Sequence, residues 1–332
     1  MKANSPAPAI QNVLLADIGG TNARFAVLAG GTVGMVSHMA VSDYGSFREA
    51  LGVYLGDLPE TGKISGAILA ASGAIHDGRC VLTNNSWVID AAELRATHGF
   101  STVRLINDFE AVAWSLPGLS GDQLRQVGGA GPVAGAPLAA LGPGTGLGMA
   151  VSIPCAAGRL VLSSEGGHAT MAGSSSREDA VIAYLRQRFG HVSAERVISG
   201  HGLENLYEAL AALDDLRLPK RVAAEITRAG IEGTCPTSRA AVDMFCAMLG
   251  TVAGNLALTL GARGGIFIAG GILRHMPEYF VRSQFRARFE EKGRFSEYLE
   301  PIPAYLILDE DAAFAGLRAL AQVEGTGRGS DD

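Results

Sequence analysis

Two segments combine glycines, a threonine hydroxyl and flanking apolar runs, a composition suited to binding phosphate. They are LLADIGGTNARFAVL, from Leu14 to Leu28, and LAALGPGTGLGMAVS, from Leu138 to Ser152. Glycine lets the backbone approach an anion closely, successive N–H groups can point at it, and a threonine hydroxyl adds a donor. Each segment alone could be an ordinary hairpin. Together they predict two phosphate-binding turns, made of Gly19, Gly20, Thr21 and Asn22 in the first and Gly144, Thr145 and Gly146 in the second.

A carboxylate stands beside the first of these turns. Asp17 ends the apolar run before Gly19, where its charge would repel phosphates unless a cation lay between them. Mg²⁺ takes one or two carboxylates together with water and phosphate oxygens. Asp17 is therefore predicted to help hold the Mg²⁺ of a nucleotide, directly or through water. The alternative is an aspartate that only caps the turn.

A second carboxylate ends another apolar run. In STVRLINDFEAVA, Asn107 and Asp108 follow a predicted buried strand and precede a predicted helix. Ligands bind at the carboxyl ends of strands in open α/β sheets. A carboxylate there can accept the proton of a hydroxyl that attacks a phosphoryl group. Asp108 is thus a candidate general base, the alternative being that this pair caps the helix.

Three further polar side chains come from glycine-rich turns later in the chain. Glu165 and His168 lie in SSEGGHATMAG, and Glu195 lies in HVSAERVISGHG. Each alone is best explained as a solvated glutamate or a satisfied histidine. With Asn107 and Asp108 they form a set that could hydrogen-bond the vicinal hydroxyls of a sugar.

The elements that must position these groups follow from apolar patterning. Buried strands are predicted where apolar residues run continuously, and helices where they recur at helical spacing or follow a capping residue. The Gly/Pro/Ala stretch 127–137 is the best candidate for a boundary between halves. Gly250 and Gly254 would lie on one helix face, where another element could approach closely. The predicted strands are 13–17, 24–28, 32–41, 64–72, 101–108, 138–142, 147–153, 159–164, 264–273 and 304–308, and the predicted helices are 47–55, 90–97, 109–116, 175–189, 238–260 and 312–322.

Composition excludes several classes of protein. The 332 residues carry a net charge of only -6, with no clustered basic face for nucleic acid. The four cysteines show neither metal-ligand nor disulfide spacing and are expected to be buried free thiols. The N-terminus lacks the apolar core of a signal peptide. No apolar run is expected to span a membrane, because the longest candidate, 256–273, is interrupted by Arg263 and several glycines. A cytoplasmic protein with no nucleic-acid or membrane partner is expected.

Taken together, these motifs resemble those of the bacterial glucokinases, which are hexokinase-type sugar kinases of the actin-like ATPase superfamily. DIGGTNARFAV and GPGTGLG resemble the two phosphate motifs of that family, and GGIFIAGGI resembles its adenosine motif. INDFEAVA, EGGH and SAERVISGHGLENLY resemble its sugar-binding segments. The match runs from about Leu14 to Ala321 in the family's order.

The resemblance implies a reaction and a set of roles. It implies transfer of the γ-phosphoryl group of Mg·ATP to the 6-hydroxyl of glucose, with Asp108 as the base. It adds Gly270 and Gly271 to the ATP site and gives Asn107, Glu165, His168 and Glu195 contacts with glucose. It also implies a homodimer.

The implied fold is α/β, with two lobes of the actin-like ATPase and hexokinase type. Each lobe has a mixed central sheet flanked by helices, and the active site lies in the cleft between them. The expected divisions are a flexible 1–11, a small lobe at 12–110, a large lobe at 111–322 and a disordered tail at 323–332. The last predicted helix, 312–322, belongs to the large lobe in sequence but can pack on the small lobe.

The sequence departs from the family beside the predicted site. Pro143 replaces the usual alanine in the second phosphate turn, which removes one N–H donor. Ser163 and Ser164 precede Glu165 in place of Pro-Gly, and Ala169-Thr170-Met171 follow His168 in place of a Val-Asp-Phe-like segment. These changes could alter loop order or hexose selectivity.

Three other functions share part of this pattern. An actin-like ATPase would have the phosphate turns without the sugar set. A sugar-responsive repressor would need a DNA-binding module, for which about a dozen residues before the first strand are too few. A kinase for another hexose stays open, as does a phosphoryl donor other than ATP, such as ADP or polyphosphate.

Overall fold

The computed structural model describes residues 12–59, 64–82, 85–156 and 158–327. The chain divides into two compact units, Met1–Gly118 with Asp311–Asp332 and Leu119–Glu310. The predicted flexible N-terminus, 1–11, lies outside the described residues. We call the two parts the first and the second unit and describe each by itself.

The first unit is built on a mixed sheet. Its strands are β1 (Asn12–Ile18), β2 (Asn22–Ala29), β3 (Thr32–Val33), β4 (Ser37–Ala40), β5 (Ile64–Ala71) and β9 (Thr102–Asn107). The sheet runs in the order β3-β2-β1-β5-β9, and β4 also pairs with β2. Strands β1, β5 and β9 are parallel, whereas β2 is antiparallel to β1. The single strand predicted for 32–41 is two short strands, β3 and β4.

Both faces of this sheet are buried, which explains the continuous apolar runs of β1 and β5. Successive side chains of a strand point to opposite faces. Leu14, Ala16 and Ile18 accordingly pack with helices α1 (Phe47–Gly56) and α2 (Ala91–His98), whereas Leu15 packs on the other face. As predicted, Asp90 caps α2, accepting hydrogen bonds from the N–H groups of its first turn. A small three-stranded sheet completes this side, made of β6 (Ile75–His76), β7 (Arg79–Val81) and β8 (Val88–Asp90).

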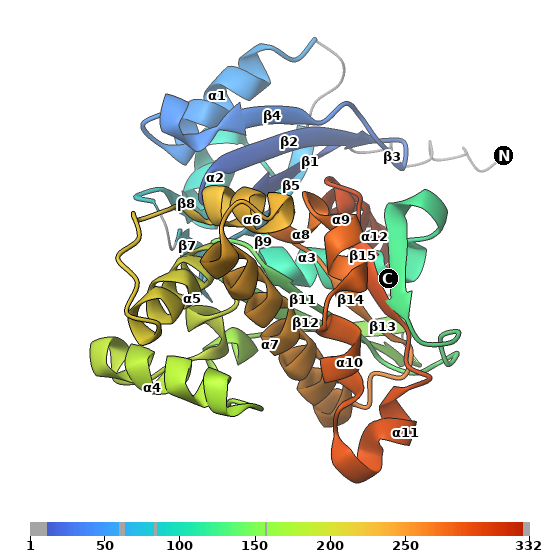
Figure 1. Ribbon diagram of the computed structural model, residues 1–332. Coiled ribbons are helices and arrows are strands. Elements are labelled where there is room, and N and C mark those ends of the chain that lie inside the picture. The colour runs from blue at the N-terminus through green and yellow to red at the C-terminus, as the bar shows by residue number, and fades with distance from the viewer. Residues whose placement is uncertain (1–11, 60–63, 83–84, 157, 328–332) are drawn as a thin grey trace, which may run out of the picture. The chain divides into compact units, whose positions relative to one another are not determined.

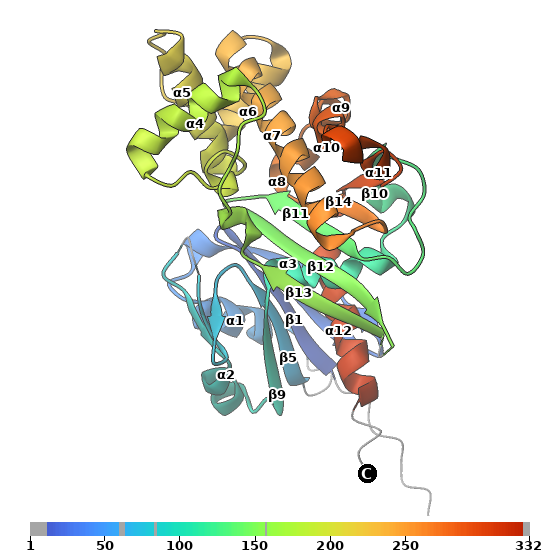
Figure 2. The ribbon, with the colours of Figure 1, turned by 90° about the horizontal axis from the view of Figure 1, so that it is seen from below.

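The opposite face is covered by α3 (Asp108–Ser115) and α12 (Ala312–Gly327), which lie side by side (Figure 2). Phe314, Leu317 and Leu320 of α12 join the cluster around Leu15. A Cβ on Gly316 would collide with the carbonyl of Ala111, so glycine allows the two helices to approach this closely. The closing helix of the chain therefore belongs to the first unit. It continues past Gln322, so part of the segment predicted to be disordered is helical, and 328–332 lie outside the described residues.

The second unit has its own mixed sheet, in the order β10-β15-β14-β11-β12-β13. Strands β11, β14 and β15 are parallel, and the others pair antiparallel. The strands are β10 (Leu124–Gly128), β11 (Leu138–Pro143), β12 (Leu147–Cys155), β13 (Gly158–Ser164), β14 (Gly265–Ile268) and β15 (Ala304–Ile307).

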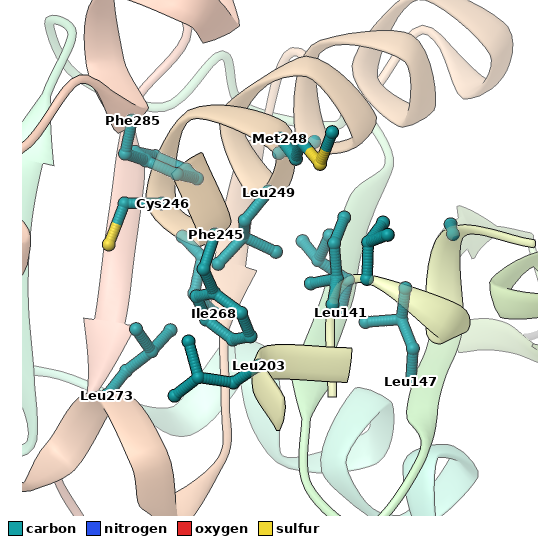
Figure 3. Packing of buried hydrophobic residues seen from close by; sticks show 14 of the residues in the cluster. Leu141, Leu147, Leu203, Phe245, Cys246, Met248, Leu249, Ile268, Leu273 and Phe285 are labelled. Atoms are coloured by element: carbon teal, nitrogen blue, oxygen red, sulfur yellow. The ribbon is translucent and has the colours of Figure 1, made fainter. Parts of the chain in front are cut away.

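Helices pack beside this sheet, and the longest, α7 (Pro236–Leu260), contacts α5, α6 and α10 (Figure 1). Figure 3 shows Phe245 and Leu249 of α7 among side chains of the strands and other helices. A Cβ on Gly250 or Gly254 would collide with backbone oxygens of α10, which confirms the predicted close approach. The remaining helices are α4 (Ser176–Phe189), α5 (Gly200–Leu213), α6 (Ala223–Glu232), α8 (Gly271–Arg274), α9 (Pro277–Arg282), α10 (Phe285–Glu290) and α11 (Ser296–Leu299).

Several expectations are corrected by the structure. The stretch 127–137 lies inside the second unit, where Val133 N–H donates to Arg263 O and Ala130 N–H donates to Pro301 O. Among the cysteines, Cys155 is exposed rather than buried, and the other three are buried free thiols. By length and composition α7 could cross a membrane, which the sequence reading missed, but 67% of its most apolar window is buried inside the protein.

Candidate active site

The predicted catalytic groups meet at one edge of the first unit's sheet. Parallel pairing aligns the carboxyl ends of β1, β5 and β9, with Ile18 opposite Ala71 and Ala71 opposite Asn107. Ser72 N–H donates to Ile18 O at 3.0 Å and joins the ends of β1 and β5. Asp17, Asn107 and Asp108 therefore share the edge at which α/β sheets bind ligands.

Asp108 is the first residue of α3, and Asn107 is its N-cap. The N–H of Phe109 donates to Asn107 Oδ1 and to Asp108 Oδ1, each at 2.9 Å. Capping is thus part of the role of this pair. Burial raises the pKa of Asp108 to about 7, and the negative charge of Asp17 adds to the rise, while hydrogen bonds from Phe109 and Ser72 oppose it. A carboxyl group with a pKa near neutrality suits general-base catalysis.

Asp17 has a cationic partner that the sequence reading did not anticipate. Because Asp17 lies opposite Arg24 in the β1–β2 ladder, its Oδ2 forms an ion pair with Arg24 Nη1 at 3.1 Å. Both side chains are largely buried. Arg24 therefore balances part of the Asp17 charge that was expected to need a metal ion. A search for pairs facing each other across the predicted hairpin could have found Arg24.

The first Gly/Thr turn is a hairpin connection between β1 and β2. Gly19 N–H donates to Asn22 O at 2.9 Å and closes it. Asn22 Nδ2 donates to Thr21 Oγ1 at 3.1 Å, and Asn85 Nδ2 donates to Gly20 O at 3.4 Å. A Cβ on Gly19 would make only an ordinary contact with Asn22 O.

The second Gly/Thr turn joins β11 and β12 and is held by the Glu195 segment. Gly144 N–H donates to Gly146 O at 2.8 Å, and Gly144 O accepts from Gly200 N–H at 2.9 Å. Leu147 N–H donates to Glu195 Oε2 at 3.0 Å. A Cβ on Gly146 would collide with that carboxylate, whereas one on Gly144 would meet open space. The space that Gly144 leaves free is available to a ligand.

The three candidate sugar ligands of the second unit lie together. Glu165 precedes the 3₁₀ turn Gly166–His168, and Glu195 lies in the 3₁₀ turn Ala194–Arg196. His168 Nδ1 is 3.8 Å from Glu195 Oε1, and His168 Nε2 is 3.8 Å from Glu165 Oε2. Backbone hydrogen bonds and a Thr170–Ser193 bridge tie the two turns together. Glu165 and His168 are mostly exposed, so their polar atoms are open to a ligand.

The segment that follows β14 carries the remaining predicted residues. Gly270 has a φ of 113°, and a Cβ there would collide with Pro143 O, so this position requires glycine on both counts. Gly271 begins α8, and a Cβ there would meet open space. Gly270 thus packs against the end of β11, next to the second turn. The buried strand predicted within 264–273 ends at Ile268 before the predicted Gly-Gly turn, and this turn begins the short helix α8.

A cavity of about 600 Å³ adjoins this helix. His275, whose N–H donates to Gly271 O at 3.2 Å, is in its wall. Arg239 and Asp243 of α7 also line the cavity, and Arg239 lies over the Tyr279 ring at 5.1 Å. The volume is within the range of small-molecule sites.

Comparison with known proteins identifies the family of this chain. The family model described as Glucokinase matches residues 14–324. The chain belongs to the glucokinase family. It is 48% identical to a glucokinase of Paramagnetospirillum magneticum, over 93% of this chain and 97% of that protein. It is 43% identical to a glucokinase of Nitrobacter hamburgensis, over 92% of this chain and 96% of that protein.

Solved structures of glucokinases have the same fold. A glucokinase from an Antarctic psychrotroph superposes with a TM-score of 0.83 at 35% identity, covering 95% of this chain and 99% of that one. A glucokinase from Balamuthia mandrillaris, solved with glucose, has a TM-score of 0.78 at 21% identity and covers 96% of each chain. The resemblance found in the motifs and the α/β fold of the hexokinase and actin-like ATPase type are thereby confirmed.

Within this glucokinase-family chain, the predicted site residues form two groups. The first unit brings together Asp17, the first turn, Asn107 and Asp108, and the second unit brings together the second turn, the Gly270–Gly271 turn and the sugar set. Their roles stay predictions. Sequence reasoning missed Arg24, the Ser72 hydrogen bond to Asp108 and the cavity beside α8. No pattern of residue types signals the last two, because their partners are distant in sequence.

Proposed function

We propose that this protein is a glucokinase that transfers the γ-phosphoryl group of ATP to the 6-hydroxyl of glucose, giving glucose 6-phosphate and ADP. The observation that carries the proposal is a partly buried carboxyl group, Asp108, beside a Gly/Thr phosphate turn in a chain of the glucokinase family. Its pKa of about 7 suits a base that accepts a hydroxyl proton.

The chemistry follows from these groups. The oxygen of the glucose 6-hydroxyl bonds to the γ-phosphorus while Asp108 accepts the hydroxyl proton. At the same time the bond from that phosphorus to the β–γ bridging oxygen breaks, and ADP leaves. Asn107, Glu165, His168 and Glu195 hold the other hydroxyl groups of glucose by hydrogen bonds. Asp108 belongs to the first unit, and Glu165, His168 and Glu195 belong to the second.

The nucleotide is assigned to the glycine turns and the cavity. Backbone N–H groups of the turns at Gly19–Asn22 and Gly144–Gly146 bind the phosphates. Gly271 O accepts a hydrogen bond from the N–H of His275, which lines the cavity, and we assign the adenosine to this cavity. Arg239 and Tyr279 offer a stacked cationic and aromatic wall to the base.

Asp17 fits the Mg²⁺ that accompanies ATP. The described residues contain no group of three or more acidic, histidine or cysteine ligands. Mg·ATP brings phosphate oxygens and water, so one protein carboxylate at the phosphate turn is sufficient. Asp17 would provide that carboxylate directly or through water, and the ion would supply positive charge near the transferred phosphoryl group. The proposal further includes a cytoplasmic location and a homodimer.

A coupled assay of ADP release tests the function. The purified protein is given Mg·ATP with glucose, mannose, fructose, glucosamine or an N-acetyl sugar, and a reaction without sugar serves as the control. ADP release that depends on glucose supports the proposal. Release without sugar would indicate an ATPase, and preference for another sugar would indicate a different hexose kinase. Replacing ATP by ADP or polyphosphate identifies the donor.

A further inference from the structure

Ser199 lies between the sugar set and the second phosphate turn. Its side chain is buried, with 2% of the residue exposed. The hydroxyl accepts a hydrogen bond from Gly202 N–H at 2.9 Å, which caps α5. The same hydroxyl donates to Glu195 O at 2.8 Å. One buried oxygen therefore joins the start of a helix to the backbone of a proposed glucose ligand.

The two segments that Ser199 joins, Glu195 and the start of α5, both bond to the backbone of the second phosphate turn or of the residue that follows it. The Glu195 carboxylate accepts from Leu147 N–H at 3.0 Å, directly after the turn. Gly200, the first residue of α5, donates to Gly144 O at 2.9 Å. The hydrogen bonds of Ser199 thus complete a ring that contains Glu195, Leu147, Gly144 and Gly200.

Close packing leaves this ring little freedom. A Cβ on Gly202 would lie 2.6 Å from the carbonyl carbon of Val197 and 3.0 Å from Glu195 O, so the first turn of α5 rests on the Glu195 turn. Val197 and Leu203 are fully buried at this contact. Glu195 cannot shift without moving the start of α5 or the phosphate turn.

We propose that Ser199 is a positioning residue that fixes Glu195 relative to the Gly144–Gly146 turn, so that glucose binding and nucleotide binding favour each other through it. The inference rests on the proposed function, since it assigns glucose to Glu195 and phosphate to the turn. A coupling of this kind is reciprocal, because each ligand changes the affinity of the other by the same factor.

A second serine provides a matched control. Ser175 caps α4, where its hydroxyl accepts from Glu178 N–H at 3.3 Å. Helices α4 and α5 each have 14 residues and belong to the same unit. Removing either cap takes one hydrogen bond from the first turn of a helix. Of the two serines, only Ser199 also bonds to Glu195.

The experiment measures the coupling directly. Calorimetry gives the dissociation constant of glucose with and without a non-hydrolysable ATP analogue, and the ratio of the two is the coupling factor. Typical coupling factors are about 5–150. We expect Ser199→Ala to bring the factor close to 1, Ser175→Ala to leave it at the wild-type value, and Ser199→Thr to restore it. Both alanine variants should lower the melting temperature by about 2–4 °C, as loss of a cap does.

A glycine variant separates capping from positioning. Glycine is nearly as good as serine at an N-cap, so Ser199→Gly should keep the stability of α5 while losing the bond to Glu195. We expect its coupling factor to fall as in Ser199→Ala. If Ser199→Gly keeps the wild-type factor, if Ser175→Ala loses as much, or if the wild type shows no coupling, the inference is wrong. A wild-type protein that does not phosphorylate glucose overturns the proposed function as well.

Discussion

The two Gly/Thr turns follow one plan in sequence but are held in different ways. The first is closed within its own hairpin, by Gly19 N–H donating to Asn22 O. The second depends on distant residues, since Glu195 and Gly200 both bond to its backbone. The first turn is also bonded by Asn85 and Val41, but neither belongs to the sugar set. A change in the first turn can therefore leave Glu195 in place, whereas a change in the second must disturb it.

The carboxyl groups near the two turns differ in how deeply they are buried. In the first unit the pKa of Asp108 is raised to about 7 by burial and by Asp17. In the second unit the side chain of Glu165 is 75% exposed and that of Glu195 is 29% exposed. Burial provides a group that exchanges a proton near neutral pH, and exposure leaves carboxylate oxygens open to hydrogen bonds from a ligand. In the proposed function, the first unit thus supplies the base and the second supplies most of the sugar ligands.

The largest effect is expected at Asp108. Asp108→Asn removes the base but keeps the shape, so kcat should fall by about 10²–10⁴-fold while the KM for glucose changes little. Steady-state kinetics check this, with Asp90→Asn as a control, because Asp90 caps α2 in the same unit and asparagine caps equally well. A near-normal kcat in Asp108→Asn would rule out the assignment.

Paired glycine substitutions compare the turns directly. Gly146→Ala places a methyl group against the Glu195 carboxylate, so the KM values for both glucose and ATP should rise by about tenfold or more. Gly19→Ala meets only Asn22 O at 3.5 Å and should affect the KM for ATP alone. Equal effects of the two substitutions on glucose would remove the distinction between the turns.

The pH dependence of the rate should reflect the raised pKa of Asp108. Because the base must be deprotonated, kcat/KM for glucose should fall about tenfold per pH unit below about 7. Rates measured from pH 5 to pH 9 in buffers of constant ionic strength test this. A profile that stays flat down to pH 5 would contradict a base of this kind.

The raised pKa of Asp108 should also make the stability of the fold depend on pH. The folded protein holds the Asp108 proton up to about pH 7, whereas the unfolded chain releases it near 3.8, so ionisation destabilises the fold progressively between these values. Asp108→Asn should therefore raise the melting temperature most above pH 7, with a gain that shrinks toward pH 4. Calorimetric scans at pH 4, 6 and 8 measure it, and a gain that grows on acidification would be the wrong sign.

The smallest effect is expected from Arg24. Arg24→Gln removes the charge that balances Asp17, and the stronger field of Asp17 should raise the pKa of Asp108 further. The acidic limb of kcat/KM should move to higher pH, with a few-fold loss of rate at pH 7. Arg24→Lys keeps a positive charge and should keep the limb near its original place. An unmoved limb in Arg24→Gln would mean that Asp17 does not act on the base through this pair.

Local patterning predicts most of the elements but few of their partners. The strands around Gly19 and Gly144, the cap at Asp90 and the helix packing at Gly250 all follow from neighbouring residues. The bond from Leu147 to Glu195 joins residues 48 apart and depends on how helix and sheet pack. The Asp17–Arg24 pair was within reach, because the hairpin register fixes it.

Helix α12 has a consequence for the order of events during translation. Its Phe314, Leu317 and Leu320 fill the core under β1, β5 and β9, yet a ribosome makes them after the whole second unit. The nascent chain carries Asp17 and Asp108 early, on a sheet with one face covered by α3 but still lacking α12. The second unit, Leu119–Glu310, is continuous and can fold while synthesis proceeds. The half that carries the proposed catalytic base is therefore completed last, although it is begun first.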